Sequence, residues 1–336
     1  MPVLENISLS QYNTFKINAC TKYFSSFIST EELENLIERF TETPLMILGG
    51  GSNILFTKDF EGAVLKNEIR GIELLHEDAD YVYVKAGAGE NWHQFVLHCI
   101  KHNWAGVENL SLIPGCVGAA PIQNIGAYGV ELDDVFWSLE AFHLKEKKVF
   151  TFTASDCEFA YRNSVFKTIY KNEFAILSVT LQLKKRPVFH TSYGAITEEL
   201  EKMKINELSI RAISNAVINI RQSKLPDPAK IPNAGSFFKN PEVDTEKFNQ
   251  LSKDFPGLIS YALPDNKYKL AAGWMIEQCG WKGYRKGDTG CHEKQSLVLI
   301  NYGNAKGEEI FKLSEEILQS VNLKFRVLLE REVNII

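Results

Sequence analysis

Two glycine-rich segments carry the residue types that could hold a large anionic ligand. Residues 49–53 read Gly-Gly-Gly-Ser-Asn, and residues 110–129 contain four glycines and two prolines but no charged side chain. Glycine lets backbone press against a ligand and adopt positive φ, and the N–H groups of such loops can form a concave anion site. We therefore predict that the two segments form two walls around one extended, phosphate-bearing ligand. For the second segment, the alternative is a tightly packed turn inside a core.

Short strand patterns precede the glycines and must position them. Leu45–Leu48 is a buried-strand pattern that the triglycine ends, and Tyr81–Ala86 is a strand pattern rich in β-branched and aromatic residues. Gly87-Ala-Gly89 joins the latter to an amphipathic helix. This order resembles the start of a dinucleotide-binding fingerprint, but Trp92 would block the close helix–strand packing that a third glycine allows, so we expect no Rossmann domain. The apolar face of the helix is Trp92, Phe95, Val96, Cys99 and Ile100.

Strand and helix patterns alternate along the rest of the chain, which predicts an α+β class with open sheets. Ser209 is the expected N-cap of a helix over Ser209–Arg221, which Leu225-Pro-Asp-Pro228 stops. The polar segment Lys184–Pro187 indicates a domain edge. Another helix is predicted over Glu308–Val321. The further predicted strands are Trp137–Leu144, Lys148–Thr153, Phe174–Leu183 and Phe325–Leu329.

The composition is typical of a globular protein of two or three domains. The chain has 336 residues, of which 45% are apolar, and a net charge of −5, which argues against a general nucleic-acid binder. No apolar run approaches the roughly 18 residues of a membrane span, and the N-terminus shows no secretory signal, so we expect a cytoplasmic protein. The six cysteines form no C-x-x-C pair. We expect no metal site, because Cys279, Cys291 and His292 lack a fourth ligand.

Several sequence blocks, in one order along roughly residues 12–336, resemble the UDP-N-acetylenolpyruvoylglucosamine reductase (MurB) family. Each block alone is weak evidence, but chance agreement of this many is negligible. The blocks are Leu48–Leu55 (LGGGSNIL), Ile113–Pro121 (IPGCVGAAP), Gln123–Glu131 (QNIGAYGVE), Tyr161–Ser164 (YRNS), Arg221–Pro228 (RQSKLPDP), Asn233–Pro241 (NAGSFFKNP) and His292–Gln295 (HEKQ).

The resemblance implies an FAD-dependent reductase. The family reduces the enolpyruvyl ether of UDP-N-acetylglucosamine to UDP-N-acetylmuramate, a cytoplasmic step of peptidoglycan precursor synthesis, with FAD recharged by NADPH at the same site. The implied fold is a vanillyl-alcohol-oxidase-type FAD-binding region of two α+β subdomains over 17–188, followed by a MurB-type α+β substrate domain over 200–336. The last strand would pack back near the flavin. We expect a monomer that binds a UDP-sugar but neither nucleic acid nor membrane.

The family's reaction gives three residues a role. Hydride from N5 of the reduced flavin adds to the terminal enolpyruvyl carbon, and negative charge spreads from the adjacent carbon into its carboxylate before that carbon is protonated. The resemblance places the proton donor at Ser236 and the other catalytic positions at Arg162, whose donor fork suits a carboxylate, and Glu332. We expect Glu332 to be protonated or to donate through a water, because an ionised carboxylate would repel the intermediate. Without the resemblance, a turn serine, a surface arginine and a solvated tail charge would be the simpler interpretations.

Ligand contacts follow from the same resemblance. Tyr193 matches a tyrosine on a loop that closes over the substrate diphosphate in the type I branch, and Lys224 would meet that diphosphate or the NADPH phosphate. A solvated lysine is the alternative for Lys224. Asn233 and Gln295, with Lys239 as a further candidate, would complete the sugar-nucleotide pocket. The expected cofactor-binding residues are Gly49, Gly50, Gly51, Ser52, Asn53, Pro114, Gly115, Gly118, Ala119, Asn124, Gly126, Ala127 and Tyr128.

Two other functions stay open. Another flavoenzyme of the superfamily, such as an oxidase acting on a sugar or sugar lactone, would need no carbon protonation, and the Asn-Ala-Gly-Ser-Phe-Phe block disfavours it. A non-catalytic flavin- or nucleotide-binding module would bind FAD but show no NADPH oxidation stimulated by substrate. The presence of Ser236, Arg162 and Glu332 at the three catalytic positions disfavours that module.

Overall fold

The computed structural model describes residues 2–193 and 195–336, and the chain divides into two compact units. The first unit comprises residues up to Ile7, Thr21–Gly51 and Glu61–Ser223, and the second comprises Ser8–Cys20, Ser52–Phe60 and Lys224–Ile336. This division places residues 200–223 in the first unit, and the domain bounds 17–188 and 200–336 stay a prediction. Across the described ranges, the helices are too short or too polar for any of them to cross a bilayer.

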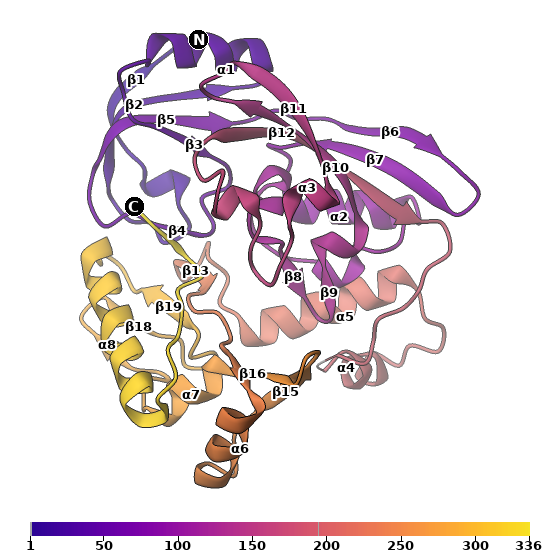
Figure 1. The fold of residues 1–336 in the computed structure, drawn as a ribbon, viewed down its shortest axis with the longest axis vertical. Helices are drawn as coiled ribbons and strands as arrows, with labels where there is room; N and C mark the ends of the chain where they lie inside the picture. Colours follow the sequence, from indigo (N-terminus) through magenta and orange to yellow (C-terminus); the bar gives the residue numbers. More distant parts are fainter. Residues whose placement is uncertain (1, 194) are drawn as a thin grey trace. The chain divides into compact units, whose positions relative to one another are not determined.

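One sheet of the first unit contains β3, the strand that leads into the triglycine loop. Its strand order is β1-β2-β5-β3, and β3 pairs parallel with β5, with Leu45 opposite Ala63 (Figure 1). The side chain of Ser29 caps helix α1 by accepting a hydrogen bond from the Glu32 backbone N–H. The core beneath this sheet includes Phe27. The elements are β1 (Leu4–Ser8), β2 (Cys20–Phe27), α1 (Thr30–Arg39), β3 (Leu45–Leu48) and β5 (Phe60–Asn67).

A second sheet of the same unit has the order β11-β10-β12-β7-β6, with antiparallel pairing throughout (Figure 1). The predicted strands Trp137–Leu144, Lys148–Thr153 and Phe174–Leu183 are confirmed to within one residue at each end. Alternating and continuous apolar patterns therefore located this sheet correctly. Its strands are β6 (Ile72–Glu77), β7 (Tyr81–Gly87), β10 (Phe136–His143), β11 (Lys148–Thr153) and β12 (Phe174–Lys184).

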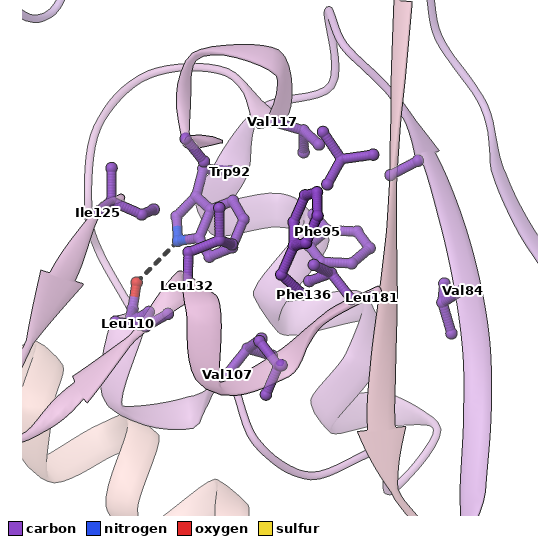
Figure 2. Close-up of a cluster of buried hydrophobic side chains, with 14 of the residues drawn as sticks. Val84, Trp92, Phe95, Val107, Leu110, Val117, Ile125, Leu132, Phe136 and Leu181 are labelled. Carbon is purple, nitrogen blue, oxygen red and sulfur yellow. Dashed lines mark hydrogen bonds between the residues drawn. The ribbon is translucent and has the colours of Figure 1, made fainter. Parts of the chain in front are cut away.

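Helix α2 (Trp92–Lys101) buries the face that the sequence predicts. The side chain of Asn91 caps it by accepting a hydrogen bond from the Gln94 backbone N–H at 3.0 Å. Trp92 is 1% exposed, and its indole N–H donates to the Leu110 carbonyl at 3.0 Å (Figure 2). Trp92 is thus a core residue whose one polar group has a hydrogen-bond partner.

The glycines of that turn are required by backbone packing. A Cβ on Gly87 would lie 2.5 Å from the carbonyl oxygen of Ile69, and a Cβ on Gly89 would lie 2.7 Å from the Cα of Glu68. Neither distance is compatible with a larger residue. The Gly87-Ala-Gly89 sequence therefore serves strand packing, in agreement with the prediction that it is not a dinucleotide-binding fingerprint.

Helices α4 (Ile196–Lys202) and α5 (Ile210–Lys224) form a separate core at the end of the first unit, in which Leu200 packs with Ile213 and Val217. Ser209 caps α5, because its Oγ accepts a hydrogen bond from the Ala212 backbone N–H at 3.1 Å. The short elements of the unit are η2 (Glu108–Leu110), η3 (Val117–Ala119), η4 (Pro121–Gln123), β8 (Gly126–Ala127), β9 (Val130–Glu131), η5 (Leu132–Val135), α3 (Ala154–Cys157) and η6 (Val165–Lys167).

The second unit contains an antiparallel sheet with the order β13-β19-β18-β17 and another with the order β14-β16-β15. Figure 1 labels β13, β19 and β18 of the first and β16 and β15 of the second. The residues of η1 (Ser10–Tyr12) and its neighbours join this unit. They are held because the Nδ2 of Asn301 donates to the Phe15 carbonyl at 2.9 Å. The other elements are β13 (Asn233–Ser236), β14 (Glu242–Asp244), α6 (Thr245–Asp254), β15 (Ser260–Leu263), β16 (Lys267–Leu270), α7 (Ala272–Gln278), β17 (Arg285–Lys286), β18 (Thr289–Cys291), β19 (Val298–Asn301) and α8 (Gly307–Phe325).

The C-terminal segment corrects one prediction. The strand predicted over Phe325–Leu329 is wrong, because α8 continues to Phe325 and ends at Arg326, whose φ is +54. Phe325 is 1% exposed and extends the buried face of the helix, so the apolar stretch begins as helix. The last strand is instead β20 (Asn334–Ile335), which pairs parallel with β4 (Ile54–Leu55).

Candidate functional site

The two glycine-rich segments contact each other in the first unit. A Cβ on Gly50 would lie 2.9 Å from the Cα of Gly115, so the two backbones touch. Gly51 has φ of +61 and Gly115 has φ of +114, which other residues rarely adopt. The two segments are therefore adjacent, and the phosphate-bearing ligand that they are predicted to enclose stays a prediction. Ser52 and Asn53, which complete the first segment, belong to the second unit.

Buried hydrogen bonds shape the later part of the second segment. Asn124 is 1% exposed and has φ of +42. Its Nδ2 donates to Glu131 Oε2 at 3.0 Å, and its Oδ1 accepts from the Asp133 backbone N–H at 3.1 Å. These bonds fix the loop that carries Gly126, Ala127 and Tyr128.

Arg162 lies against this loop. Its Nη2 donates to the Gly126 carbonyl, and its Nη1 lies 3.7 Å from Glu131 Oε1. A Cβ on Gly126 would lie 2.8 Å from that Nη1 atom, so this approach needs glycine. The φ of Arg162 is +53, an uncommon backbone conformation that often marks functional sites. Arg162 is therefore oriented by the predicted cofactor loop.

Arg221 is a candidate that sequence reasoning missed. It lies on α5, and its Nε atom is buried without a hydrogen-bond partner in residues 2–193 and 195–336. Burial lowers the pKa of Arg221, as does Arg162, whereas Tyr128 acts in the opposite sense. A buried guanidinium nitrogen without an acceptor is costly unless a ligand supplies one. One of the matched sequence blocks contains Arg221, but neither its type nor its spacing indicates burial.

Asn109 attaches the loop that carries Tyr193 to the second glycine segment. Its Nδ2 donates to the Tyr128 carbonyl at 2.9 Å and to the His190 carbonyl at 2.8 Å. A Cβ on Gly129 would lie 3.2 Å from the Cβ of Tyr193, so Tyr193 lies over this glycine. The base of the predicted closing loop is thus fixed to the predicted cofactor loop. Gly194, which follows Tyr193 in the sequence, lies outside the described residues.

In the second unit, Ser236 and Glu332 lie on neighbouring backbone segments. The Glu332 backbone N–H donates to the Phe237 carbonyl at 2.8 Å, and Phe238 forms an antiparallel bridge with Arg331. The chain near the C-terminus is therefore docked beside the end of β13. This geometry argues against a solvated tail charge at Glu332.

Asn53 connects the end of the triglycine loop to the same place. Its Nδ2 donates to the Glu332 carbonyl at 3.2 Å. The backbone carbonyl of Asn53 accepts from the Asn334 backbone N–H at 3.1 Å and from Asn334 Nδ2 at 2.9 Å. Three hydrogen bonds thus hold the segment from Glu332 to Asn334 against one predicted cofactor residue.

The predicted substrate residues of the second unit differ in environment. Lys224 is exposed at the end of α5. Gln295 is half-buried, and its Oε1 accepts from the Leu297 backbone N–H at 3.3 Å. Asn233 is 2% exposed, and its side chain bonds to the backbone of its own unit.

Each unit therefore brings together part of the predicted site. The first unit holds Arg162 beside the predicted cofactor loop and Arg221, and the second holds Ser236 beside Glu332. The three predicted catalytic residues are divided between the units in this way.

Burial disfavours the thiolate form of several cysteines. Burial raises the pKa of Cys157 and of Cys291 to about 12 and also raises the pKa of Cys116. Over the described part of the chain, His, Cys, Asp and Glu side chains form no group of three suited to a metal ion.

Comparison with known proteins finds matches along the whole chain. A family model described as an FAD binding domain matches residues 25–147, and one described as the UDP-N-acetylenolpyruvoylglucosamine reductase C-terminal domain matches residues 227–336. Curated proteins named UDP-N-acetylenolpyruvoylglucosamine reductase are similar over their full length. The one from Amoebophilus asiaticus is 52% identical and the one from Flavobacterium johnsoniae is 48% identical, each with 100% of both chains covered. That from Burkholderia multivorans is 45% identical, covering 99% of this chain and 96% of the relative.

A solved structure gives the fold independently. The crystal structure of UDP-N-acetylenolpyruvylglucosamine reductase (MurB) from Thermus caldophilus is similar with a TM-score of 0.70, covering 100% of this chain and 99% of that chain. Its sequence is 23% identical, so this likeness concerns the fold.

Proposed function

Because this chain belongs to the UDP-N-acetylenolpyruvoylglucosamine reductase family, we propose that it uses FAD and NADPH to reduce the enolpyruvyl ether of UDP-N-acetylglucosamine to UDP-N-acetylmuramate. The reaction would be a cytoplasmic step of peptidoglycan precursor synthesis, carried out by a monomer. The observation that carries the proposal is the hydrogen bond of 2.8 Å between the Glu332 N–H and the Phe237 carbonyl, which sets Glu332 beside Ser236.

The residues of the first unit fit FAD. The contact between Gly50 and Gly115 brings the triglycine backbone against a second glycine, and backbone without side chains can approach a diphosphate closely. The buried Nε of Arg221 has no acceptor in the described ranges, and an oxygen of a bound ligand would supply one. We assign FAD binding to the two glycine segments, with Asn124 and Tyr128. When bound, FAD would relay hydride from NADPH to the enolpyruvyl group.

Arg162 and Ser236 would have different roles in the reduction. Arg162 would bind the substrate carboxylate, and its contacts with Gly126 and Glu131 orient the guanidinium before substrate arrives, which lowers reorganisation. The Ser236 hydroxyl would donate the proton to the carbon that carries the carboxylate. A Cβ on Gly235 would meet no described atom within 4 Å, so there is space beside Ser236 for a ligand.

The sugar-nucleotide would be held by side chains around this centre. Lys224 suits the diphosphate, Tyr193 would lie on the loop that covers it, and Gln295 would contact the sugar-nucleotide. Closure of the Tyr193 loop would exclude water from the reduced centre.

The proposed function is tested by assaying the FAD-loaded protein with NADPH. We expect NADPH oxidation that depends on UDP-N-acetylenolpyruvoylglucosamine and does not occur with UDP-N-acetylglucosamine, which lacks the enolpyruvyl group. Oxidation that is independent of the UDP-sugar, with rapid reoxidation by oxygen, would favour the sugar-oxidase alternative instead.

A second prediction concerns the protonation of Glu332. If the carboxyl must be protonated while negative charge builds up nearby, the rate of reoxidation by the UDP-sugar should fall as pH rises. Glutamine resembles the protonated acid and does not titrate, so Glu332→Gln should remove that fall. Stopped-flow rates of the second half-reaction across pH would measure it, and a profile identical to that of the unmodified protein would contradict the proposal.

A third prediction separates binding from stability at Arg221. Arg221→Met removes a buried charge, so we expect the flavin-free protein to unfold at an equal or higher denaturant concentration. The same change should raise the FAD dissociation constant about tenfold, as expected for loss of one hydrogen bond to a charged group. Arg211→Met, at an exposed position on the same helix, is the matched control and should change neither quantity. Unchanged flavin affinity in Arg221→Met would exclude the flavin contact.

A further inference from the structure

We propose that Asn233 positions Ser236 and does not contact the substrate, an assignment that rests on the proposed function. The Nδ2 of Asn233 donates to the Ile231 carbonyl at 2.7 Å and to the Pro226 carbonyl at 3.2 Å. Its Oδ1 accepts from the Gly235 backbone N–H at 2.8 Å. The two carbonyls accept from the amide nitrogen, and the Gly235 N–H donates to the amide oxygen. The side-chain amide can therefore adopt only one orientation. At 2% exposure, the side chain is occupied by its own unit.

The Asn233 amide closes a turn directly before Ser236. The N–H that Oδ1 binds belongs to Gly235, whose φ is +71. Asn233 pairs with Ile300 and Ser236 with Val298, and the register of β13 against β19 shifts between these two pairs. Residues 234–235 therefore leave the regular ladder, and the side chain of Asn233 fixes the path of the chain into Ser236.

The chain after Ser236 has separate anchors. The Phe237 N–H donates to the Leu297 carbonyl at 2.8 Å, and the Phe237 carbonyl accepts from the Glu332 N–H at 2.8 Å. The Phe237 side chain is fully buried. Loss of the Asn233 amide would thus release Ser236 on one side only, while the sheet and core that follow keep their contacts.

The same amide connects Ser236 to the loop after Lys224. Pro226 lies two residues beyond Lys224, and Ile231 lies near the end of that loop. Both carbonyls bind the Nδ2 group of Asn233. Asn233 therefore couples the proposed proton donor to the segment that carries the proposed diphosphate contact.

The test compares Asn233→Ala with Asn301→Ala in the FAD-loaded protein. Asn301 is a matched control because it is 1% exposed and lies on β19 of the same sheet. Like that of Asn233, its amide makes three hydrogen bonds to backbone, although it donates to one carbonyl and accepts from two N–H groups. Both variants should lose stability. For Asn233→Ala alone, we expect the maximal rate of reoxidation by UDP-N-acetylenolpyruvoylglucosamine to fall about 10- to 100-fold, as small misplacements of a reacting group do.

Other readouts separate positioning from binding. In Asn233→Ala, KM for the UDP-sugar and the rate of flavin reduction by NADPH should stay within about threefold of the unmodified protein, because no binding contact is removed. A raised KM with an unchanged maximal rate would identify a substrate contact and overturn the proposal. Equal rate losses in Asn233→Ala and Asn301→Ala would also overturn it, since they would show a structural effect alone.

Amide hydrogen exchange tests the positioning without any turnover. In the substrate-free holoprotein, Asn233→Ala should speed exchange of the Gly235 amide about tenfold, as loss of one hydrogen bond implies, and leave the Phe237 amide protected. Unchanged exchange at Gly235 would overturn the proposal whatever the enzyme reduces. A faster exchange in a protein that fails to turn over the UDP-sugar would uphold the turn and reject the proposed function.

Discussion

The Ser236→Ala variant is expected to be reduced by NADPH at a normal rate and then to be reoxidised by UDP-N-acetylenolpyruvoylglucosamine about 10²- to 10⁴-fold more slowly, the range for loss of one positioned proton donor. The reason is that the anionic intermediate formed by hydride addition returns its hydride unless the adjacent carbon is protonated, whereas reduction of the flavin needs no such proton. Rapid mixing under anaerobic conditions, with flavin absorbance as the signal, measures the two half-reactions separately.

The structure indicates that this variant folds. Ser236 is half-buried, and its neighbours keep the backbone hydrogen bonds of Phe237, which do not involve the hydroxyl. Ser252→Ala, at a half-buried serine on α6 of the same unit, is the control and should leave both half-reactions unchanged. A normal second half-reaction in Ser236→Ala would remove this residue from the role of proton donor.

Local patterns predicted much of the fold. The predicted strands match β10, β11 and β12 closely, because each strand lies in a sheet whose pattern of burial is visible over a few residues. The ending of α8 was missed for a physical reason. Phe325, Val327 and Leu329 alternate as in a strand, yet Phe325 completes the buried face of the helix and only tertiary packing decides between the two.

The candidate site was less accessible to sequence reasoning. The glycine segments singled out the loops, and the family resemblance singled out the three proposed catalytic residues, but neither carries information on partners distant in the chain. The bond from Asn53 to the Glu332 carbonyl joins residues from opposite ends of the sequence. The burial of Arg221 and the inward bonding of Asn233 likewise follow from packing, and no spacing rule reports them.

The contact between the glycine segments yields the second large effect. Gly50→Ala places a Cβ 2.9 Å from the Cα of Gly115. The atom that it meets is backbone of the proposed FAD-binding loops, so no side-chain rotation can relieve the contact. The two loops must move apart, at a cost of about 1–3 kcal/mol for an overpacked site. If binding requires the original spacing, the FAD dissociation constant should rise about 100-fold. Titration of the flavin-free protein with FAD, followed by flavin fluorescence, measures this change.

The neighbouring glycine provides the control, because a Cβ on Gly49 would lie 3.7 Å from the Cβ of Cys116, an ordinary contact distance. Gly49→Ala should therefore weaken FAD binding much less than Gly50→Ala, although it adds the same methyl group one residue earlier. Circular dichroism of both variants would show whether secondary structure is retained. Equal weakening of flavin binding in both would mean that the ligand, and not Gly115, excludes a side chain here. Full affinity in Gly50→Ala would mean that the loops separate without cost and that their contact does not shape the cofactor site.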